Sequence, residues 1–171
     1  MTDKIINLIF KNPERWIHIR EIARKLKISP ETVRKHLAGL KKQDIMEGRK
    51  EGNLLQFRAN IENENYKHKK ILYNLGAIHD SGVVNFLHEY YSPKAIVLFG
   101  SYARGEDLSA SDVDIGIVTS NKKRPDLSSF EKRLARKINL SLFTRKDVSN
   151  EFFTNIINGI VLKGVLKNER L

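Results

Sequence analysis

The sequence contains no cysteine. Disulfide bonds, thiolate metal sites and cysteine nucleophiles are therefore excluded. Long apolar runs are also missing, since no stretch approaches the roughly 20 residues that a helix needs to cross a bilayer. The first ten residues are amphipathic and include Asp3 and Lys4, which does not fit a secretory signal. These absences predict a cytoplasmic protein that makes no membrane contact.

Negative charge is in short supply. The chain has 31 Lys and Arg against 20 Asp and Glu, which gives a formal net charge of +11 over 171 residues. Residues 1–60 contribute +7, residues 61–94 balance, and residues 95–171 contribute +4. Such a field attracts polyanions, with nucleic acid first among them. A solvated basic surface is the alternative that charge alone leaves open.

The first 60 residues are predicted to form three short helices and a hairpin. Asn12-Pro13 ends a first helix over residues 3–11, because proline cannot continue the hydrogen-bond ladder. Apolar residues at helical spacing predict a second helix over residues 19–26. Ser29-Pro30 opens a third helix, with serine as the cap and proline at the first helical position. A turn at Gly52 predicts a hairpin over residues 48–58.

Two further regions follow along the chain. Residues 61–92 are predicted to be a helical connector with breaks near Gly76 and Gly82, and they could supply a homodimer contact. From residue 93 the pattern alternates between strands, expected over residues 95–99, 112–119 and 138–143, and helices, expected over residues 126–137 and 146–158. Interleaved strands and helices predict one central sheet.

Residues 16–37 resemble a winged helix-turn-helix. In such a domain the third helix enters the DNA major groove with its polar face. The resemblance assigns DNA contacts to Thr32, Arg34 and Lys35 on that helix and to Arg49 and Lys50 on the hairpin. Because helix-turn-helix sequences are degenerate, a three-helix domain that binds protein instead of DNA is the alternative.

A second motif comprises Gly100-Ser101-Tyr102-Ala103-Arg104-Gly105 and Ser111-Asp112-Val113-Asp114. Glycine after a strand permits close backbone approach, and the free amides of a following helix favour phosphate oxygens. Two carboxylates at i and i+2 of a strand point to one side. They repel each other unless a hard cation such as Mg²⁺ or Mn²⁺ lies between them. A metal beside phosphate-binding amides suits nucleotidyl transfer.

This motif is similar to the signature of the DNA polymerase beta-like nucleotidyltransferase superfamily, in particular its minimal prokaryotic branch. The resemblance implies that Gly100 and Ser101 contact a nucleoside triphosphate and that Asp112 and Asp114 are catalytic and bind Mg²⁺ or Mn²⁺. It also implies a nucleotide-binding role for Arg104 and Ser111. The alternative for these two is structural, with Arg104 paired to a nearby acid and Ser111 capping a turn.

The family's third carboxylate, on a later strand, has no counterpart here. The matching position is Asn139, and an amide cannot act as a general base. Three interpretations therefore stay open. The first is an enzyme that transfers a nucleoside monophosphate to a hydroxyl, and the resemblance implies a helical toxin-like protein as one acceptor. The second is a DNA-binding regulator or antitoxin whose nucleotide site is catalytically degenerate. The third is a nucleic-acid-processing protein in which the N-terminal module delivers a DNA or RNA substrate to the site.

The predicted fold class is α+β with three parts. Residues 1–60 form a winged helix-turn-helix, residues 61–92 a helical connector, and residues 93–171 a nucleotidyltransferase-like domain with a mixed central sheet flanked by helices. The predicted partners are DNA, a nucleotide, a toxin-like protein and a second copy of the chain.

Overall fold

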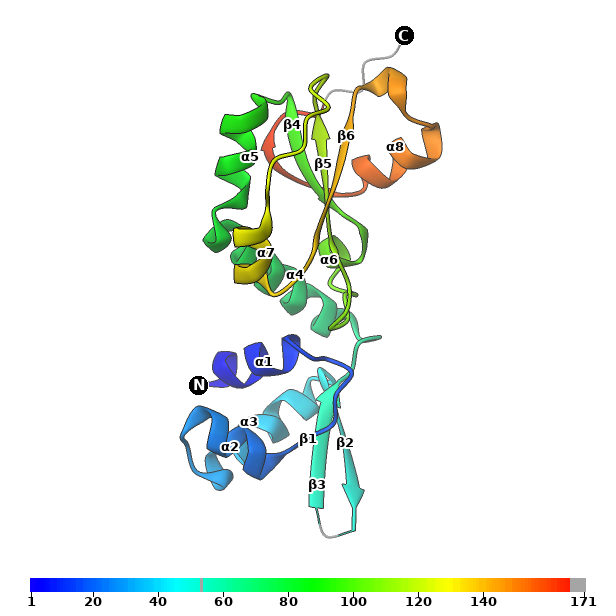
Figure 1. The fold of residues 1–171 in the computed structure, drawn as a ribbon. Coiled ribbons are helices and arrows are strands. Elements are labelled where there is room, and N and C mark those ends of the chain that lie inside the picture. The colour runs from blue at the N-terminus through cyan, green and yellow to red at the C-terminus, as the bar shows by residue number, and fades with distance from the viewer. Residues whose placement is uncertain (53, 167–171) are drawn as a thin grey trace. The chain divides into compact units, whose positions relative to one another are not determined.

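The computed structural model describes residues 1–52 and 54–166, and the chain divides into two compact units, Met1–Tyr73 and Asn74–Leu171 (Figure 1). The boundary falls inside one helix, α4 (Glu64–Ser81). Each unit has its own apolar core, and each is described separately below.

The N-terminal unit consists of three helices and a three-stranded sheet. The helices are α1 (Thr2–Phe10), α2 (Ile19–Leu26) and α3 (Pro30–Lys42), and the strands are β1 (Ile17–His18), β2 (Met46–Glu51) and β3 (Leu54–Ala59). The strand order is β1-β3-β2, and both pairings are antiparallel. The three helices and the hairpin confirm the sequence prediction. The short strand β1 was not expected, because two residues carry no periodicity.

The turn between α2 and α3 is fixed by local chemistry. Lys27 adopts a left-handed conformation with φ 55° and ends α2. The Ser29 side chain then accepts a hydrogen bond from the backbone N–H of Thr32 at 3.1 Å, and Pro30 occupies the first turn of α3. Val33 and Leu37 are fully buried, so the opposite side of α3 is left at the surface.

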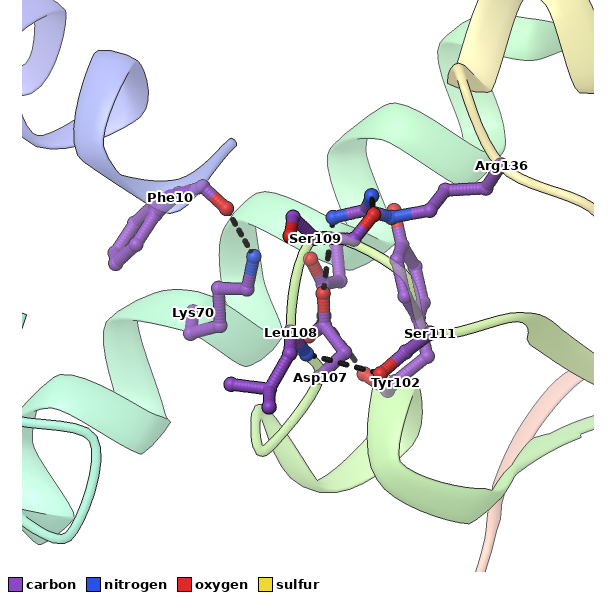
Figure 2. Close-up of polar contacts among 9 residues, drawn as sticks. Phe10, Lys70, Tyr102, Asp107, Leu108, Ser109, Ser111 and Arg136 are labelled. Carbon is purple, nitrogen blue, oxygen red and sulfur yellow. Dashed lines mark hydrogen bonds and ion pairs between the residues drawn. The ribbon is translucent and has the colours of Figure 1, made fainter. Parts of the chain in front are cut away.

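A buried lysine belongs to the same unit. The Lys70 side chain is 1% exposed, and its Nζ donates to the carbonyl oxygen of Phe10 at 2.5 Å (Figure 2). Carbonyls in the last turn of a helix lack partners within that helix. Lys70 therefore supplies a donor to the end of α1.

Helix α4 shows where the sequence prediction was partly wrong. We expected a break near Gly76, but α4 runs through it, and a Cβ at Gly76 would meet nothing within 4 Å. The break near Gly82 is confirmed. Gly82 has φ +81° and precedes helix α5 (Val83–Tyr91). A mid-helix glycine weakens a helix without ending it, whereas a positive φ ends it.

The C-terminal unit is built on a mixed sheet of order β6-β5-β4-β7. The strands are β4 (Ala95–Phe99), β5 (Val113–Val118), β6 (Ile138–Phe143) and β7 (Ile160–Gly164). β5 and β6 are parallel, and the other two pairings are antiparallel. The remaining elements are α6 (Gly100–Arg104), α7 (Ser128–Leu134), the 3-10 helix η1 (Arg145–Asp147) and α8 (Asn150–Ile157). The α+β class and the mixed sheet flanked by helices are confirmed.

Helices cover both faces of this sheet (Figure 1). Ile96 and Leu98 point into a core shared with α5 and the end of α4, whereas Ala95 and Val97 point into a core shared with Ile156 of α8. Alternation along β4 produces the two cores, because successive strand residues face opposite sides. The strand was predicted from its continuous apolar run, and burial on both faces explains that run.

Candidate nucleotide site and DNA-binding surface

Three neighbouring strands bring the predicted site residues together. Phe99, the last residue of β4, pairs with Asp114 of β5, and Asp114 pairs with Asn139 of β6. Gly100 follows Phe99 directly. Asp114 and Asn139, the position of the missing third acid in the predicted site, are therefore adjacent at one end of the sheet.

Gly100 lies directly against Asp114. Its φ is +72°, and a Cβ built there would collide with Oδ2 of the Asp114 carboxylate. Only glycine meets both demands, because it adopts positive φ freely and carries no side chain. The close contact between the Gly100 backbone and the Asp114 carboxylate therefore explains why residue 100 is glycine more fully than the positive φ of the turn alone.

Asn139 is bonded to the carboxylate that it neighbours. Its Nδ2 donates to Oδ1 of Asp114 at 3.1 Å. The Asn139 amide therefore donates a hydrogen bond to one carboxylate oxygen of Asp114. An aspartate at position 139 would instead place a second negative charge beside Asp114. Asn139 brings no proton acceptor of useful basicity to the reacting group.

The Asp114 side chain lies on the α8 side of the sheet. Asp114 and Gly116 share one side of β5 by alternation. A Cβ at Gly116 would lie 2.7 Å from Cδ1 of Ile156 in α8. Asp112 is exposed and directly precedes β5, and it comes two residues before Asp114.

Arg104 and Ser111 have the contacts that their structural reading predicts. Arg104 Nε donates to the Glu106 carboxylate at 2.7 Å, and both side chains are substantially exposed. The Ser111 hydroxyl accepts from the backbone N–H of Leu108 at 2.9 Å and closes a turn. In this state both residues shape the loop between α6 and β5, and a nucleotide-binding role for them stays a prediction.

That loop is braced by a buried polar cluster that sequence reasoning missed. Asn74 Nδ2 donates to Oδ1 of Asp107 at 2.7 Å and to the carbonyl of Tyr102 at 2.8 Å. Arg136 donates to the carbonyl of Ser109 and lies 3.8 Å from Asp107 (Figure 2). The cluster joins residues 74, 107 and 136, and no local pattern in the sequence reveals it.

The surface of α3 carries the predicted DNA contacts. Arg34 and Lys35 are exposed, and Arg34 forms an ion pair with Glu31 at 2.8 Å on the same helix. The Thr32 hydroxyl lies 2.8 Å from that of Ser29. Exposed pairs of this kind are weak, so phosphate or base edges can compete for Arg34.

The hairpin holds its arginines against an aromatic ring. The guanidinium groups of Arg49 and Arg58 lie 4.3 Å and 4.7 Å from the Trp16 ring centroid. Arg49 Nε also donates to Gln56 Oε1 at 2.8 Å. Lys50 alternates with Arg49 and is exposed on the other face of the hairpin. The two predicted wing residues are thus in different surroundings.

Comparison with known proteins gives both units a family. Residues 3–45 match a family described as winged helix-turn-helix DNA-binding, and residues 81–161 match the nucleotidyltransferase domain family. A Methanocaldococcus jannaschii protein named "Putative protein adenylyltransferase MJ1379" is 34% identical over 93 residues, which are 50% of this chain and 76% of that protein. The chain belongs to the nucleotidyltransferase family.

Asp112 and Asp114 are the two carboxylates predicted to bind a metal ion. Within residues 1–52 and 54–166, no group of three or more His, Cys, Asp or Glu could hold a metal by itself. Mg²⁺ commonly uses one or two protein carboxylates and takes its other ligands from substrate phosphates and water. Asp112 and Asp114 therefore fit a metal that arrives with a nucleotide, and they do not fit a metal held by protein ligands alone.

No helix within residues 1–52 and 54–166 is long and apolar enough to cross a bilayer.

Proposed function

We propose that this chain binds a metal–nucleoside triphosphate at the β4–β5–β6 end of its C-terminal sheet and transfers the nucleoside monophosphate to a protein hydroxyl. The hydroxyl oxygen bonds to the α-phosphorus as the α–β phosphoanhydride bond breaks, and pyrophosphate leaves. The contact between Gly100 and the Asp114 carboxylate carries the proposal. Because residue 100 has no side chain, its backbone lies directly beside the Asp114 carboxylate, and this arrangement supports a triphosphate site there. The protein acceptor follows from the printed name of the similar archaeal protein.

Each site residue has a proposed role. Asp112 and Asp114 would hold a divalent cation, which would neutralise phosphate charge and align the triphosphate. Gly100 leaves room for the phosphates, and Ser101 at the start of α6 donates to them. Asn139 orients Asp114 through its hydrogen bond. The acceptor hydroxyl transfers its proton to solvent or to a phosphate oxygen, because Asn139 is no base.

The N-terminal unit is proposed to bind duplex DNA through Thr32, Arg34 and Lys35 of α3. Arg49 and Lys50 of the hairpin are proposed to contact the phosphate backbone of the DNA. A second copy of the chain on a palindromic site is part of this proposal, because winged helices commonly act as dimers. A helical toxin-like protein is the proposed acceptor, on the family resemblance.

Transfer is tested with α-labelled ATP, Mg²⁺ and a host-cell protein extract. We expect label in protein with the native chain and at least a tenfold loss with Asp112→Ala or Asp114→Ala. Asp126→Ala is the matched control. It removes one aspartate that bonds only to Ser128 in the described contacts, and it should transfer normally.

Asn139 favours a second function, a DNA-binding regulator that senses a metal–nucleotide without transferring it. The same assay separates the two functions when calorimetric ATP binding is added. If the native chain binds Mg–ATP but labels nothing while Asn139→Asp labels protein, the sensor is correct. If neither variant binds Mg–ATP, both functions of the site are rejected.

A further inference from the structure

The end of the C-terminal sheet away from the nucleotide site gathers basic residues. At the nucleotide end, β4 finishes and β5 and β6 begin; at the other end, β4 begins and β5 and β6 finish. This basic end is defined by Lys94 before β4, Lys122 and Lys123 after β5, and Arg145 and Lys146 after β6. Strand direction thus brings together cations that are separated by up to about 50 positions in the chain.

The acidic residues nearby offset these charges only in part. Asp147 accepts from Lys122 Nζ at 2.8 Å, and Asp126 lies three residues after Lys123 in the same loop. Glu89 of α5 and Glu151 of α8 lie on the flanking helices. The basic end retains a net positive charge, because its five cations together with Arg124 outnumber these four acids.

Its loops are anchored while two of its ammonium groups face solvent. Lys122 Nζ also donates to the carbonyl of Leu142, and the Tyr91 hydroxyl donates to the carbonyl of Lys123 at 2.6 Å. Arg145 donates to Asn150 Oδ1 at 2.6 Å. Lys123 and Lys146 are both exposed. The surface therefore presents lysines from a fixed backbone.

We propose that this basic end binds the phosphate backbone of duplex DNA, as a contact additional to the winged helix. The inference rests on the proposed DNA binding of the N-terminal unit. Lysines act as point charges that suit evenly spaced phosphates and carry no base specificity. Each lysine that pairs with a phosphate releases condensed counterions, so such contacts add salt-dependent affinity without sequence preference.

The test measures duplex binding by the full chain as a function of salt. Each phosphate contact contributes about 0.9 to the slope of log K against log salt concentration. We expect the double variant Lys123→Ala/Lys146→Ala to lose roughly 1.8 from the slope, equally for two unrelated sequences of the same length. The matched control is Lys132→Ala/Lys137→Ala, which removes two exposed lysines from α7 and from the residue before β6.

The outcomes separate this inference from the winged-helix proposal. Arg34→Ala/Lys35→Ala should weaken binding whether or not the basic end takes part. If that variant is impaired while Lys123→Ala/Lys146→Ala keeps the native slope, the basic end does not bind DNA and only this inference fails. If the native chain retards no duplex at low salt, the winged-helix proposal fails as well. The variant Lys123→Ala/Lys146→Ala could instead keep the native salt slope for duplex DNA and lose the binding to polyglutamate that the native chain shows. That result would assign the basic end to an acidic protein partner and overturn the inference. Circular dichroism of each variant confirms that it is folded.

Discussion

At the scale of single residues, Gly100 makes the sharpest demand on the sequence. Alanine there would meet the Asp114 carboxylate and would also hold a positive φ, which costs of order 1 kcal/mol. We predict that Gly100→Ala weakens Mg–ATP binding at least tenfold in calorimetry. Gly52→Ala is the control, because Gly52 has φ +57° but open space around its Cβ. Equal affinity of the two variants would show that Asp114 does not need the glycine.

A second residue-scale prediction concerns Asp147. The hydrogen bond from Lys122 and those from Thr144 lower the pKa of its carboxyl from the usual 3.8 to about 2. Because the folded pKa is depressed, the stabilisation is fully present above about pH 4 and is lost as pH falls through about 2. Carboxyl shifts in an NMR titration should report this, and Lys122→Ala should return the pKa toward 3.8. An unchanged midpoint in the variant would contradict the ion pair.

At the scale of elements, the hairpin depends on Trp16. We predict that Arg49→Ala destabilises the N-terminal unit by about 0.5–1 kcal/mol and changes the emission of Trp16, because a cation leaves the ring. Lys50→Ala should leave both unchanged, since no contact of its side chain is found among the described residues. Fluorescence-monitored urea unfolding measures both variants. Identical emission from Arg49→Ala and the native chain would argue against the stacking.

The loop between α6 and β5 depends on the buried cluster around Asp107. Arg136→Met would leave the Asp107 carboxylate, which has 0% side-chain exposure, without this cation. Removing one partner of a buried pair costs about 3 kcal/mol, so we expect a clear loss in urea midpoint and weaker Mg–ATP binding through Asp112. Arg124→Met is a control on an exposed arginine that bonds the Leu140 carbonyl. Equal stability of the two variants would show that the cluster is dispensable.

At the scale of the whole molecule, the two units have separate cores. The N-terminal core runs from Ile5 to Tyr66, and the C-terminal cores from Ile78 to Ile156. Mg–ATP at 100 times its Kd should stabilise the folded C-terminal unit by about 2.7 kcal/mol. The fluorescence of Trp16, the one tryptophan, reports the N-terminal unit. Its melting temperature should not change with Mg–ATP, whereas scanning calorimetry should show a higher melting temperature for the C-terminal unit. A parallel shift of both transitions would indicate cooperative unfolding.

Periodicity and capping predicted most of the architecture. Ser29-Pro30 predicted the start of α3, and alternating residues predicted the strand over residues 138–143 that carries Asn139. β1 was missed because two residues carry no periodicity, and β7 was missed because only three consecutive apolar residues mark it in the sequence. The Asp107–Arg136 cluster was missed because its members are brought together only by tertiary folding. Local patterns predict local structure well, and they do not report contacts between distant segments.

The bond from Asn139 to Asp114 has an evolutionary consequence. Asparagine and aspartate have nearly the same shape, and their codons differ by one base. The strand register already places residue 139 beside Asp114, so that one substitution restores the third acid without rebuilding the backbone. A lineage can therefore lose or regain the acid by single mutations, and close relatives of this chain should include both residues at this position.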